Sequence, residues 1–581
     1  MHELNDRKEF EGRADFIEDA DLLDWTVENE HFREIQEKLF EKGAILLAGP
    51  RGSGKTHQLK VAYNKSIQNL EYPLAIYVSF GKYYHLEPLL VKSPSAYKIF
   101  QTWILGKITL GCQQLVDDLN NSKKKPPIEF NVLDEFPDLE TFVSQVEKGS
   151  PQAQDEYWDL IERLTIQKVV KILEMLANRL NRKRIVLFLD DAALTLTPSY
   201  MREFFDVFRS LKSSRISPKA SVYPGTTEYG PRFHVGHDAD KVNCWFNVED
   251  NSYSAFMDQF IQKRFPDIQK SISPDVINLL KYAAFGIPRV FINLIKEFEQ
   301  GKKKKGSQEV FNMVIDEQAD LIKAEYLSLS EKMPQYKTII HTGDDLFEKI
   351  TTLLTEENRR YHEKGNNKKQ IIIGIQEKQE FTITISRMIK FLIEAGLLYP
   401  IRIPVKHGSN KPGSSEPREY DRYIPHLLFL IKKRAFSSDR GFNASQIVEF
   451  IGRESAKHPV RRAIDTILDK RQIKNIKLDL PPCSHCGTLR LSEDQRFCHQ
   501  CGHQLLDKSR FEACMKIPID NLPLPGWIKE GLKEDIVIKT LEDILSHPDL
   551  GNELQKIHYV GPKRSENIDK KIKEYVEEFL A

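Results

Sequence analysis

The sequence has no long hydrophobic run and almost no net charge. No apolar stretch among its 581 residues reaches the roughly 18 residues of a membrane-spanning helix, which argues against an integral membrane protein. The first 25 residues are acidic and lack the apolar core of a secretory signal, so we expect a cytoplasmic protein. The 85 Lys and Arg residues balance the 84 Asp and Glu residues, leaving a formal charge of +1. Nucleic-acid binding would therefore depend on local basic patches.

Cysteine is scarce and unevenly placed. Four of the seven cysteines lie between residues 483 and 501, and the other three are scattered along the chain. In a reducing compartment, such a tight cluster predicts a metal site before it predicts disulfides. Outside the motifs described below, we find no second carboxylate-rich or histidine-based catalytic set, so we expect no hidden nuclease or other effector activity.

Short apolar strands alternate with helices over the first 250 residues. The pattern predicts strands at 44–49, 74–80, 184–190 and 219–227, and helices at 28–43, about 95–120, about 155–181 and 204–213. Because each strand is apolar throughout, we expect an α/β fold with a parallel sheet and helices on both of its faces. Beyond residue 250 the chain continues as helix after helix. The segment 384–403 then predicts a helix, a turn at Ala395–Gly396 and a strand.

A glycine-rich loop directly follows the first strand. The loop reads GPRGSGKT and fits the pattern G-x-x-x-x-G-K-[ST], with Gly49, Pro50, Arg51, Gly52, Ser53, Gly54, Lys55 and Thr56 in order. Glycines let backbone N–H groups curl around a phosphate, and the next helix offers its positive end to the anion. Lys55 supplies charge to the β- and γ-phosphates, and the Thr56 hydroxyl ligates Mg²⁺. The alternative is a chance glycine-rich turn, which the flanking strand and helix disfavour.

Two carboxylates end the strand at 184–190. Asp190 is placed to hold Mg²⁺ through water, and Asp191 is placed to act as a base that orients the attacking water. The alternative is a simple strand-end cap. The loop upstream favours the functional interpretation.

The order of these motifs resembles that of AAA+ P-loop ATPases, in the branch that contains origin-recognition-complex-like and STAND ATPases. The strand ending in Thr226 and Thr227 resembles the strand that carries the sensor-1 residue, and FGIPRVFINLI looks like the G-x-P-R of sensor 2. The resemblance implies that Thr227 and Arg289 read the γ-phosphate, with Arg289 on a helical lid. A plain arginine at a helix N-terminus is the alternative for Arg289.

Two further features of this resemblance bear on turnover. Many AAA+ proteins have Asp-Glu where this chain has Asp190–Asp191, so turnover is expected to be slow or nucleotide binding to act as a switch. By position alone, Arg264 in FIQKRFP is a candidate for an arginine finger that acts on a neighbouring subunit. A charge on the lid surface is an equal alternative for Arg264.

The cysteine cluster has the spacing of a structural zinc site. Two C-x2-C pairs are separated by eleven residues, and a glycine follows each pair (Gly487 and Gly502). The four expected ligands are Cys483, Cys486, Cys498 and Cys501. Because thiolates fill all four positions, we expect a structural Zn²⁺ ribbon rather than a catalytic site. Such ribbons bind nucleic acid or protein, and the sequence does not choose between them.

The last helical segment resembles a helix-hairpin-helix DNA-binding unit. The stretch YVGPKR would expose backbone N–H groups at Gly561 to a phosphate, with charge added by Lys563 and Arg564. Contacts of this kind position a protein on DNA without reading its sequence. The alternative is a two-helix packing unit with a glycine turn.

The region before the zinc ribbon resembles a winged helix. Arg387 and Lys390 would lie on its recognition helix, with Lys406, Lys411 and Arg418 in or near the wing. A winged helix serves protein contacts equally well.

These motifs divide the chain into seven segments. We expect an N-terminal segment (1–27), a P-loop ATPase core (28–250), a helical lid (251–335), a winged helix (340–436), a helical linker (437–478), a zinc ribbon (479–508) and a helix-hairpin-helix-like unit (525–581).

The sequence predicts an ATP-hydrolysing enzyme that associates with DNA. Its expected cofactors are ATP, Mg²⁺ and Zn²⁺, and its expected partners are DNA, bound independently of sequence, and further copies of the chain or a partner protein. The resemblance implies a prokaryotic defence, mobile-element or replication-type machinery. The rival hypothesis is a nucleotide-switched scaffold or sensor whose ribbon and hairpin bind partner proteins.

Overall fold

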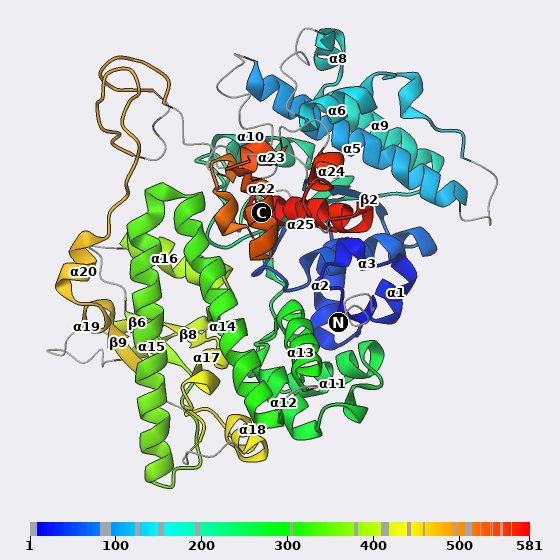
Figure 1. Cartoon of the computed structure of the whole chain (residues 1–581). Coiled ribbons are helices and arrows are strands. Elements are labelled where there is room, and N and C mark those ends of the chain that lie inside the picture. Colours follow the sequence, from blue (N-terminus) through cyan, green and yellow to red (C-terminus); the bar gives the residue numbers. More distant parts are fainter. Residues whose placement is uncertain are drawn as a thin grey trace, which may run out of the picture.

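The structure is a computed structural model of the whole chain (Figure 1). It describes residues 8–81, 95–121, 128–148, 156–191, 198–302, 306–376, 382–407, 418–437, 443–456, 459–492, 495, 497–505, 514–522, 524–534, 536, 538–545, 550–558 and 560–580. Lys411 and the Lys563 side chain lie outside this description. None of the helices in the described ranges is long and apolar enough to cross a membrane.

Five parallel strands form the sheet of the N-terminal half. They are β1 (Ile45–Ala48), β2 (Leu74–Ser79), β3 (Ile185–Asp190), β4 (Ile216–Val222) and β5 (Asp240–Asn243), in the spatial order β2-β3-β4-β1-β5. Every pairing between them is parallel, which confirms the predicted α/β fold and matches that of P-loop NTPases. Because parallel strands end at one edge, the loops after β1, β3 and β4 meet there.

Helices cover both faces of this sheet, as predicted. Leu46 and Ile76 share one core with α5 (Ala96–Asn121), α9 (Ile166–Arg179) and α10 (Pro198–Leu211). Leu47 and Phe188 face the opposite core, with α2 (Glu30–Phe40) and α3 (Lys55–Gln68). Helix α9 shows why these segments are helical. Thr165 caps its first turn, and apolar residues recur every three or four positions along its buried side.

The lid and the following unit share one continuous core. The lid helices are α11 (Tyr253–Arg264), α12 (Pro274–Ala283) and α13 (Pro288–Lys302), and two long helices follow, α14 (Ser307–Lys332) and α15 (Lys337–Glu363). Helix α16 (Thr382–Glu394) then leads into the long antiparallel pair β7 (Leu398–His407) and β8 (Arg418–Pro425). Between α16 and β7, Gly396 makes the predicted turn at a φ of +73°. The winged-helix assignment itself stays a prediction.

The segment 437–478 is more than the helical linker that we expected. It contains α18 (Ala444–Gly452), β9 (Val460–Ala463), α19 (Ile464–Ile467) and α20 (Lys470–Asn475). Strand β9 pairs with β6 (Ile373–Gln376) and completes a four-stranded sheet of order β7-β8-β6-β9. The sequence of β9 is only four residues long and contains two arginines, so it carries no apolar strand signal.

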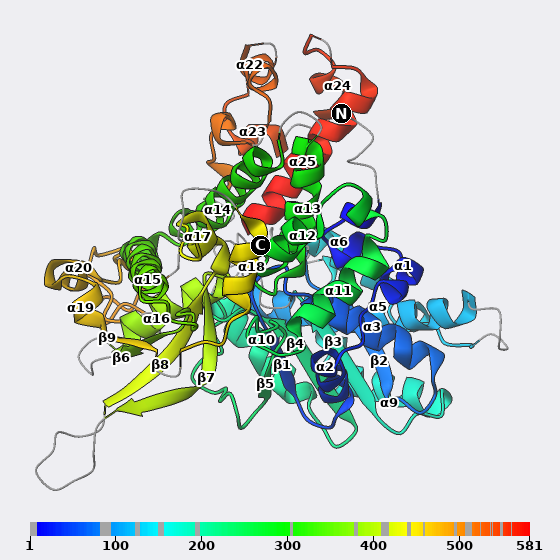
Figure 2. The ribbon, with the colours of Figure 1, turned by 90° about the horizontal axis from the view of Figure 1, so that it is seen from below.

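The C-terminal residues form a separate small core. It joins α22 (Gly526–Glu534), α23 (Leu541–Leu545), α24 (Leu550–Leu554) and α25 (Pro562–Leu580) through residues such as Leu532, Leu554 and Ile572. Figure 2 shows these four helices together at one end of the molecule. A helical unit was predicted here, and its DNA-binding role is untested.

Candidate functional site

The glycine-rich loop has the shape of a phosphate cradle. Gly52 and Gly54 adopt φ values of +79° and +94°, a region that favours glycine, and α3 begins immediately afterwards at Lys55. The Lys55 Nζ atom donates to the carbonyls of Gly49 (2.9 Å) and Pro50 (3.1 Å) and so closes over its own loop. The Ser53 hydroxyl is buried without a hydrogen-bond partner among the described residues. A bound phosphate would satisfy both groups.

Burial dominates the electrostatics of Lys55. Its side chain is 5% exposed, and this burial lowers its pKa to about 8, against the opposing effect of the carboxylates Asp190 and Asp191. The Tyr223 ring, which follows β4, lies 3.9 Å from the Lys55 Nζ atom. A polyanion in the loop would restore the environment in which the charged amine is stable.

The two carboxylates lie at the neighbouring strand end, as predicted. Asp190 is 1% exposed and accepts a hydrogen bond from the Tyr77 hydroxyl (2.9 Å). The Asp191 backbone N–H donates to the Ser221 hydroxyl (2.8 Å), and its φ of +52° is one that aspartate tolerates better than most residues. Burial, followed by the charge of Asp190, raises the pKa of Asp191 to about 7. A carboxylate of this kind accepts a proton readily near neutral pH.

Arg289 reaches the loop from the lid. It follows Pro288 in the first turn of α13, and its backbone N–H points to the Gly52 carbonyl at 3.5 Å. A Cβ on Gly52 would lie 2.7 Å from the Arg289 Cβ, so this approach requires glycine. Burial lowers the pKa of Arg289, and the positive charge of Arg51 adds to this effect. The structure thus brings Arg289 to the cradle, and its role as a γ-phosphate sensor stays a prediction.

A cavity of about 820 Å³ lies beside the loop. Its lining includes Thr56, Asp191, Tyr223 and Arg289, together with the N-terminal segment from Lys8 to His31. The sequence had given that segment no partner. One wall carries the buried Asn29 Nδ2 atom, which has no hydrogen-bond partner within the described part of the chain. The volume suits a nucleotide-sized ligand.

Arg264 holds the N-terminal segment against the lid. Its guanidinium donates to the backbone carbonyls of Glu9 and Glu11 and stacks over the Trp25 ring at 4.6 Å. The side chain is only 8% exposed. In this structure Arg264 is therefore neither an exposed finger nor a lid-surface charge, the two roles that the sequence had suggested.

Thr227 lies in the turn that follows β4, and its role as a γ-phosphate sensor stays a prediction. Its hydroxyl accepts a hydrogen bond from the Tyr223 backbone N–H (2.9 Å), so it shapes the turn that follows β4. The aromatic side chain that comes nearest to Lys55 from this strand belongs to Tyr223, which sequence reasoning missed. The apolar pattern carried the predicted strand on to residue 227, whereas the strand ends at Val222.

The turn after β4 is fastened to α16. The Glu394 carboxylate accepts from the backbone N–H groups of Gly225 and Thr226, both at 2.7 Å, and from the Thr226 hydroxyl at 2.9 Å. About two turns earlier, Arg387 donates to Glu228 at 3.1 Å. Arg387, expected on a recognition helix, is thus turned towards the unit that contains the β1–β5 sheet.

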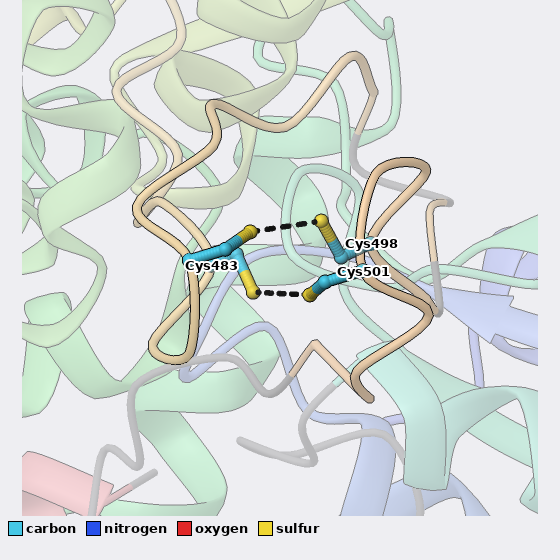
Figure 3. Close-up of side chains that lie close together, drawn as sticks. Cys483, Cys498 and Cys501 are labelled. Carbon is cyan, nitrogen blue, oxygen red and sulfur yellow. Dashed lines mark hydrogen bonds between the residues drawn. The ribbon is translucent and has the colours of Figure 1, made fainter.

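Four cysteine sulfurs converge in the ribbon. Figure 3 shows Cys483, Cys498 and Cys501 pointing at one another across two knuckle loops. The Sγ atoms of Cys483 and Cys501 are 3.6 Å apart, and those of Cys486 and Cys498 are 3.5 Å apart. A tetrahedron with Zn–S bonds of about 2.3 Å has edges of about 3.8 Å, so these sulfurs fit Zn²⁺ closely. All four ligand atoms lie within 4.8 Å of one another.

The knuckle glycines behave as the spacing predicted. Gly487 and Gly502 have φ values of +73° and +71°. Their backbone N–H groups donate to the carbonyls of Cys483 (2.8 Å) and Cys498 (2.9 Å), which closes each turn. The two loops are therefore arranged for metal binding by their own backbone hydrogen bonds.

The turn at Gly561 leads directly into α25, and the helix-hairpin-helix assignment stays a prediction. Pro562 opens α25, and the backbone N–H groups of Arg564 and Ser565 donate to the Gly561 carbonyl at 3.0 and 2.9 Å. Apart from Gly561 and its chain neighbours, no atom of the described residues lies within 4 Å of the place that a Gly561 Cβ would occupy, so the turn is open on that side. Arg564 is exposed. A phosphate contact at Gly561, Lys563 and Arg564 stays a prediction.

Comparisons with known proteins add little beyond the fold. No protein-family model and no curated protein matches the sequence. A Walker-type ATPase of Pyrococcus abyssi aligns at 12% identity and a TM-score of 0.38, covering 73% of this chain and 99% of its own. The ORC1 protein of Aeropyrum pernix in complex with DNA aligns at 14% identity and a TM-score of 0.26, covering 74% and 97%. At these scores the likenesses decide nothing about activity.

Proposed function

We propose that the chain is a magnesium-dependent ATPase of the AAA+ class. The observation that carries this proposal is the meeting of Lys55, Asp190 and Asp191 at one edge of the sheet, beside a cavity of about 820 Å³. The cradle glycines, the Ser53 hydroxyl and the Lys55 amine supply the donors that a triphosphate needs. A structural role alone does not explain why Lys55, Asp190 and Asp191 are buried together beside this cavity.

The residues around the cavity divide the work of hydrolysis. Mg²⁺, held by the Thr56 hydroxyl and through water by Asp190, would offset the charge of the phosphates. Asp191 orients the attacking water and accepts its proton, for which its raised pKa is suited. Arg289 contributes positive charge from the lid, and the N-terminal segment shields the cavity from solvent. Slow turnover remains our expectation, because aspartate reaches less far than the glutamate of many AAA+ proteins.

We further propose that the chain associates with DNA without reading its sequence. The open turn at Gly561 and the exposed Arg564 support this proposal. A concentration of basic residues between positions 459 and 478 supports it as well. Zn²⁺ is proposed as a structural ion of the ribbon. A role in prokaryotic defence, mobile elements or replication stays a hypothesis.

One observation favours the rival function of a nucleotide-driven switch. Tyr223 contacts Lys55, and two and three residues later, at Gly225 and Thr226, the same turn is held by Glu394 of α16. A phosphate that draws Lys55 away from its loop carbonyls would disturb this turn and thereby α16. Such coupling suits a protein whose bound nucleotide sets the position of a neighbouring domain.

Two measurements test these functions. ATP turnover by the purified chain, with and without Mg²⁺, tests the enzyme, and absence of both turnover and MgATP binding would refute it. Binding of a 30-bp mixed-sequence duplex in MgATP, MgADP and no nucleotide tests the DNA association. Duplex binding that is absent in all three states would leave the switch as the better function.

A further inference from the structure

A short segment that no motif covers carries a concentrated positive charge. Residues 459–478 contain six basic and two acidic side chains, a net charge of +4, whereas the whole chain has +1. We call the six basic residues the β9–α20 strip: Arg461, Arg462, Lys470, Arg471, Lys474 and Lys477. Figure 1 shows β9, α19 and α20 along one outer margin of the molecule, away from the P-loop sheet.

The fold turns these charges to solvent. Ile464, Ile467 and Ile473 of the same segment are buried in the core of the lid and the second sheet, which anchors it. Arg461 is half-buried, and the other five members of the strip are exposed. The segment is therefore amphipathic, with its apolar side fixed and its basic side free to meet a partner.

Among the residues that the structure describes, no acidic side chain pairs with the strip. None of its six members forms an ion pair with any residue that the structure describes. By contrast, the consecutive lysines Lys432 and Lys433 pair with Asp320 (3.1 Å) and Glu348 (2.8 Å). Six neighbouring cations without counter-charges repel one another, so an external polyanion would stabilise them.

Two acids near α20 have other partners. Asp469 accepts from the Gln472 backbone N–H (2.7 Å) and completes a capping box at the start of α20. Asp345 of α15 accepts from the Gln472 side chain at 2.8 Å. These contacts fix α20 and leave the lysines and arginines of the strip unpaired.

The chemistry of the strip points to the phosphates of duplex DNA. No aromatic residue occurs between 459 and 478, so the strip offers no surface on which the bases of a single strand stack. Lysine and arginine side chains alone suit contacts with a phosphate backbone, which are independent of sequence. Arg387 of the expected recognition helix is engaged with Glu228, which makes the exposed strip the better candidate for a phosphate contact in this unit.

We propose that the β9–α20 strip binds the phosphate backbone of duplex DNA. This inference rests on the proposed DNA association and names the surface responsible for it. It differs from that proposal in placing the main contact on β9 and α20 rather than on α16 or the C-terminal hairpin.

The test is the salt dependence of duplex binding by the full chain. The variant K470Q/R471Q/K474Q removes three charges from exposed side chains, so its fold should persist. Each phosphate contact contributes about 0.9 to the slope of log K against log salt, so the slope should fall by roughly three and affinity at low salt by more than tenfold. Fluorescence anisotropy of a labelled 30-bp mixed-sequence duplex between about 50 and 200 mM salt measures both.

A matched variant controls for net charge. K171Q/R179Q/K183Q also removes three exposed charges, two from α9 and one from the turn that follows it, and is expected to leave the slope unchanged. If wild type and K470Q/R471Q/K474Q bind the duplex with equal slopes, the proposed DNA contact of the β9–α20 strip is refuted. The proposal that the chain associates with DNA would still stand. No binding by wild type overturns both, and MgATP binding measured in parallel shows whether the enzyme proposal survives.

Discussion

At the residue scale, the phosphate cradle contains ionisable side chains whose pKa values are shifted by burial. Lys55 hydrogen-bonds to the backbone of its own loop, and burial lowers its pKa to about 8. The pKa of Asp191 is raised, because burial and the charge of Asp190 both disfavour its ionised form. A triphosphate with Mg²⁺ supplies the missing charges to both groups at once, which is why they are better explained together than separately.

Replacing Lys55 with alanine should remove most of the affinity for MgATP. A hydrogen bond to a charged group is worth about 1.5–3 kcal/mol, so Lys55→Ala should weaken binding roughly 10- to 100-fold. Isothermal titration calorimetry measures the change. Lys42→Ala, at an exposed position near the end of α2, is the control and should bind as wild type. Unchanged affinity in Lys55→Ala would refute the cradle.

Replacing Asp191 with asparagine should separate binding from turnover. Asparagine tolerates the φ of +52° at this position, so Asp191→Asn should fold and bind MgATP within a few-fold of wild type. Without the base, turnover should fall by about 100-fold or more. A coupled phosphate-release assay with saturating MgATP tests this, and a variant as fast as wild type would remove Asp191 from the mechanism.

Residue types with fixed spacing were predictable, whereas neighbours from distant segments were not. The loop residues, Asp190, Asp191 and the cysteines follow from local motifs, because the chemistry requires those types at those intervals. Tyr223 and the N-terminal wall of the cavity were missed. Their approach to Lys55 depends on how β4 ends and on where the first thirty residues pack, and neither leaves a periodic signal.

At the element scale, α16 is the part of the second unit most directly connected to the P-loop sheet. Glu394 holds the turn after β4 from one end of the helix, and Arg387 holds Glu228 from its middle. The turn at Gly396 also packs against the lid, since a Cβ there would lie 2.8 Å from Ile287. Helix α16 therefore contacts both the strand end and the lid, the two parts that nucleotide binding would move.

Removing the Glu394 carboxylate should weaken the contact between α16 and the turn that follows β4. Glu394→Ala leaves two backbone N–H groups without their acceptor, at a cost of about 1–3 kcal/mol each if they stay buried. Hydrogen exchange should quicken at 225–230 and along α16, while MgATP binding persists. Glu356→Ala, exposed on α15, is the control and should change neither region. Unaltered protection in Glu394→Ala would show that the two units are held together by other contacts.

The zinc ribbon gives a second prediction at this scale. Cys483→Ser should lower the zinc content from one ion per chain towards none and expose residues 479–505 to protease, with MgATP affinity unchanged. Cys112→Ala, a buried cysteine of α5 far from the ribbon in sequence, should keep its zinc. Mass spectrometry of the intact protein under native conditions counts the ion, and a wild-type protein purified without zinc would end the proposal.

Elements with a strong local pattern were predicted, and weak ones were not. The strands β1, β2 and β3 are apolar except for the last residue of β2 and of β3, and the apolar face of α16 repeats at helical spacing. Three of the four residues of β5 and two of the four residues of β9 are polar, and each strand pairs at an edge of its sheet. Their existence depends on a neighbouring strand already in place, so a single sequence carries little trace of them.

At the scale of the whole molecule, the N-terminal segment joins the lid to the ATPase core. Arg264 and Arg289, both from the lid, donate to carbonyls of Glu9, Glu11 and Gly12, and the same segment lines the cavity beside the cradle. One segment therefore both contacts the lid and forms a wall of the cavity in this structure. An arginine finger acting between subunits would require Arg264 to leave these carbonyls.

The variant Arg264→Ala distinguishes the two roles. If Arg264 fixes the N-terminal segment within its own chain, the variant should bind MgATP about tenfold more weakly, because the wall of the cavity loses the hydrogen bonds of a charged group. Mixing it with Lys55→Ala protein should then restore no turnover, since each chain lacks part of its own site. If Arg264 instead acts as an arginine finger on a neighbouring subunit, mixing the two variants should restore turnover. The Arg264 supplied by Lys55→Ala subunits would complete the sites of Arg264→Ala subunits, and turnover would rise with the mixing ratio.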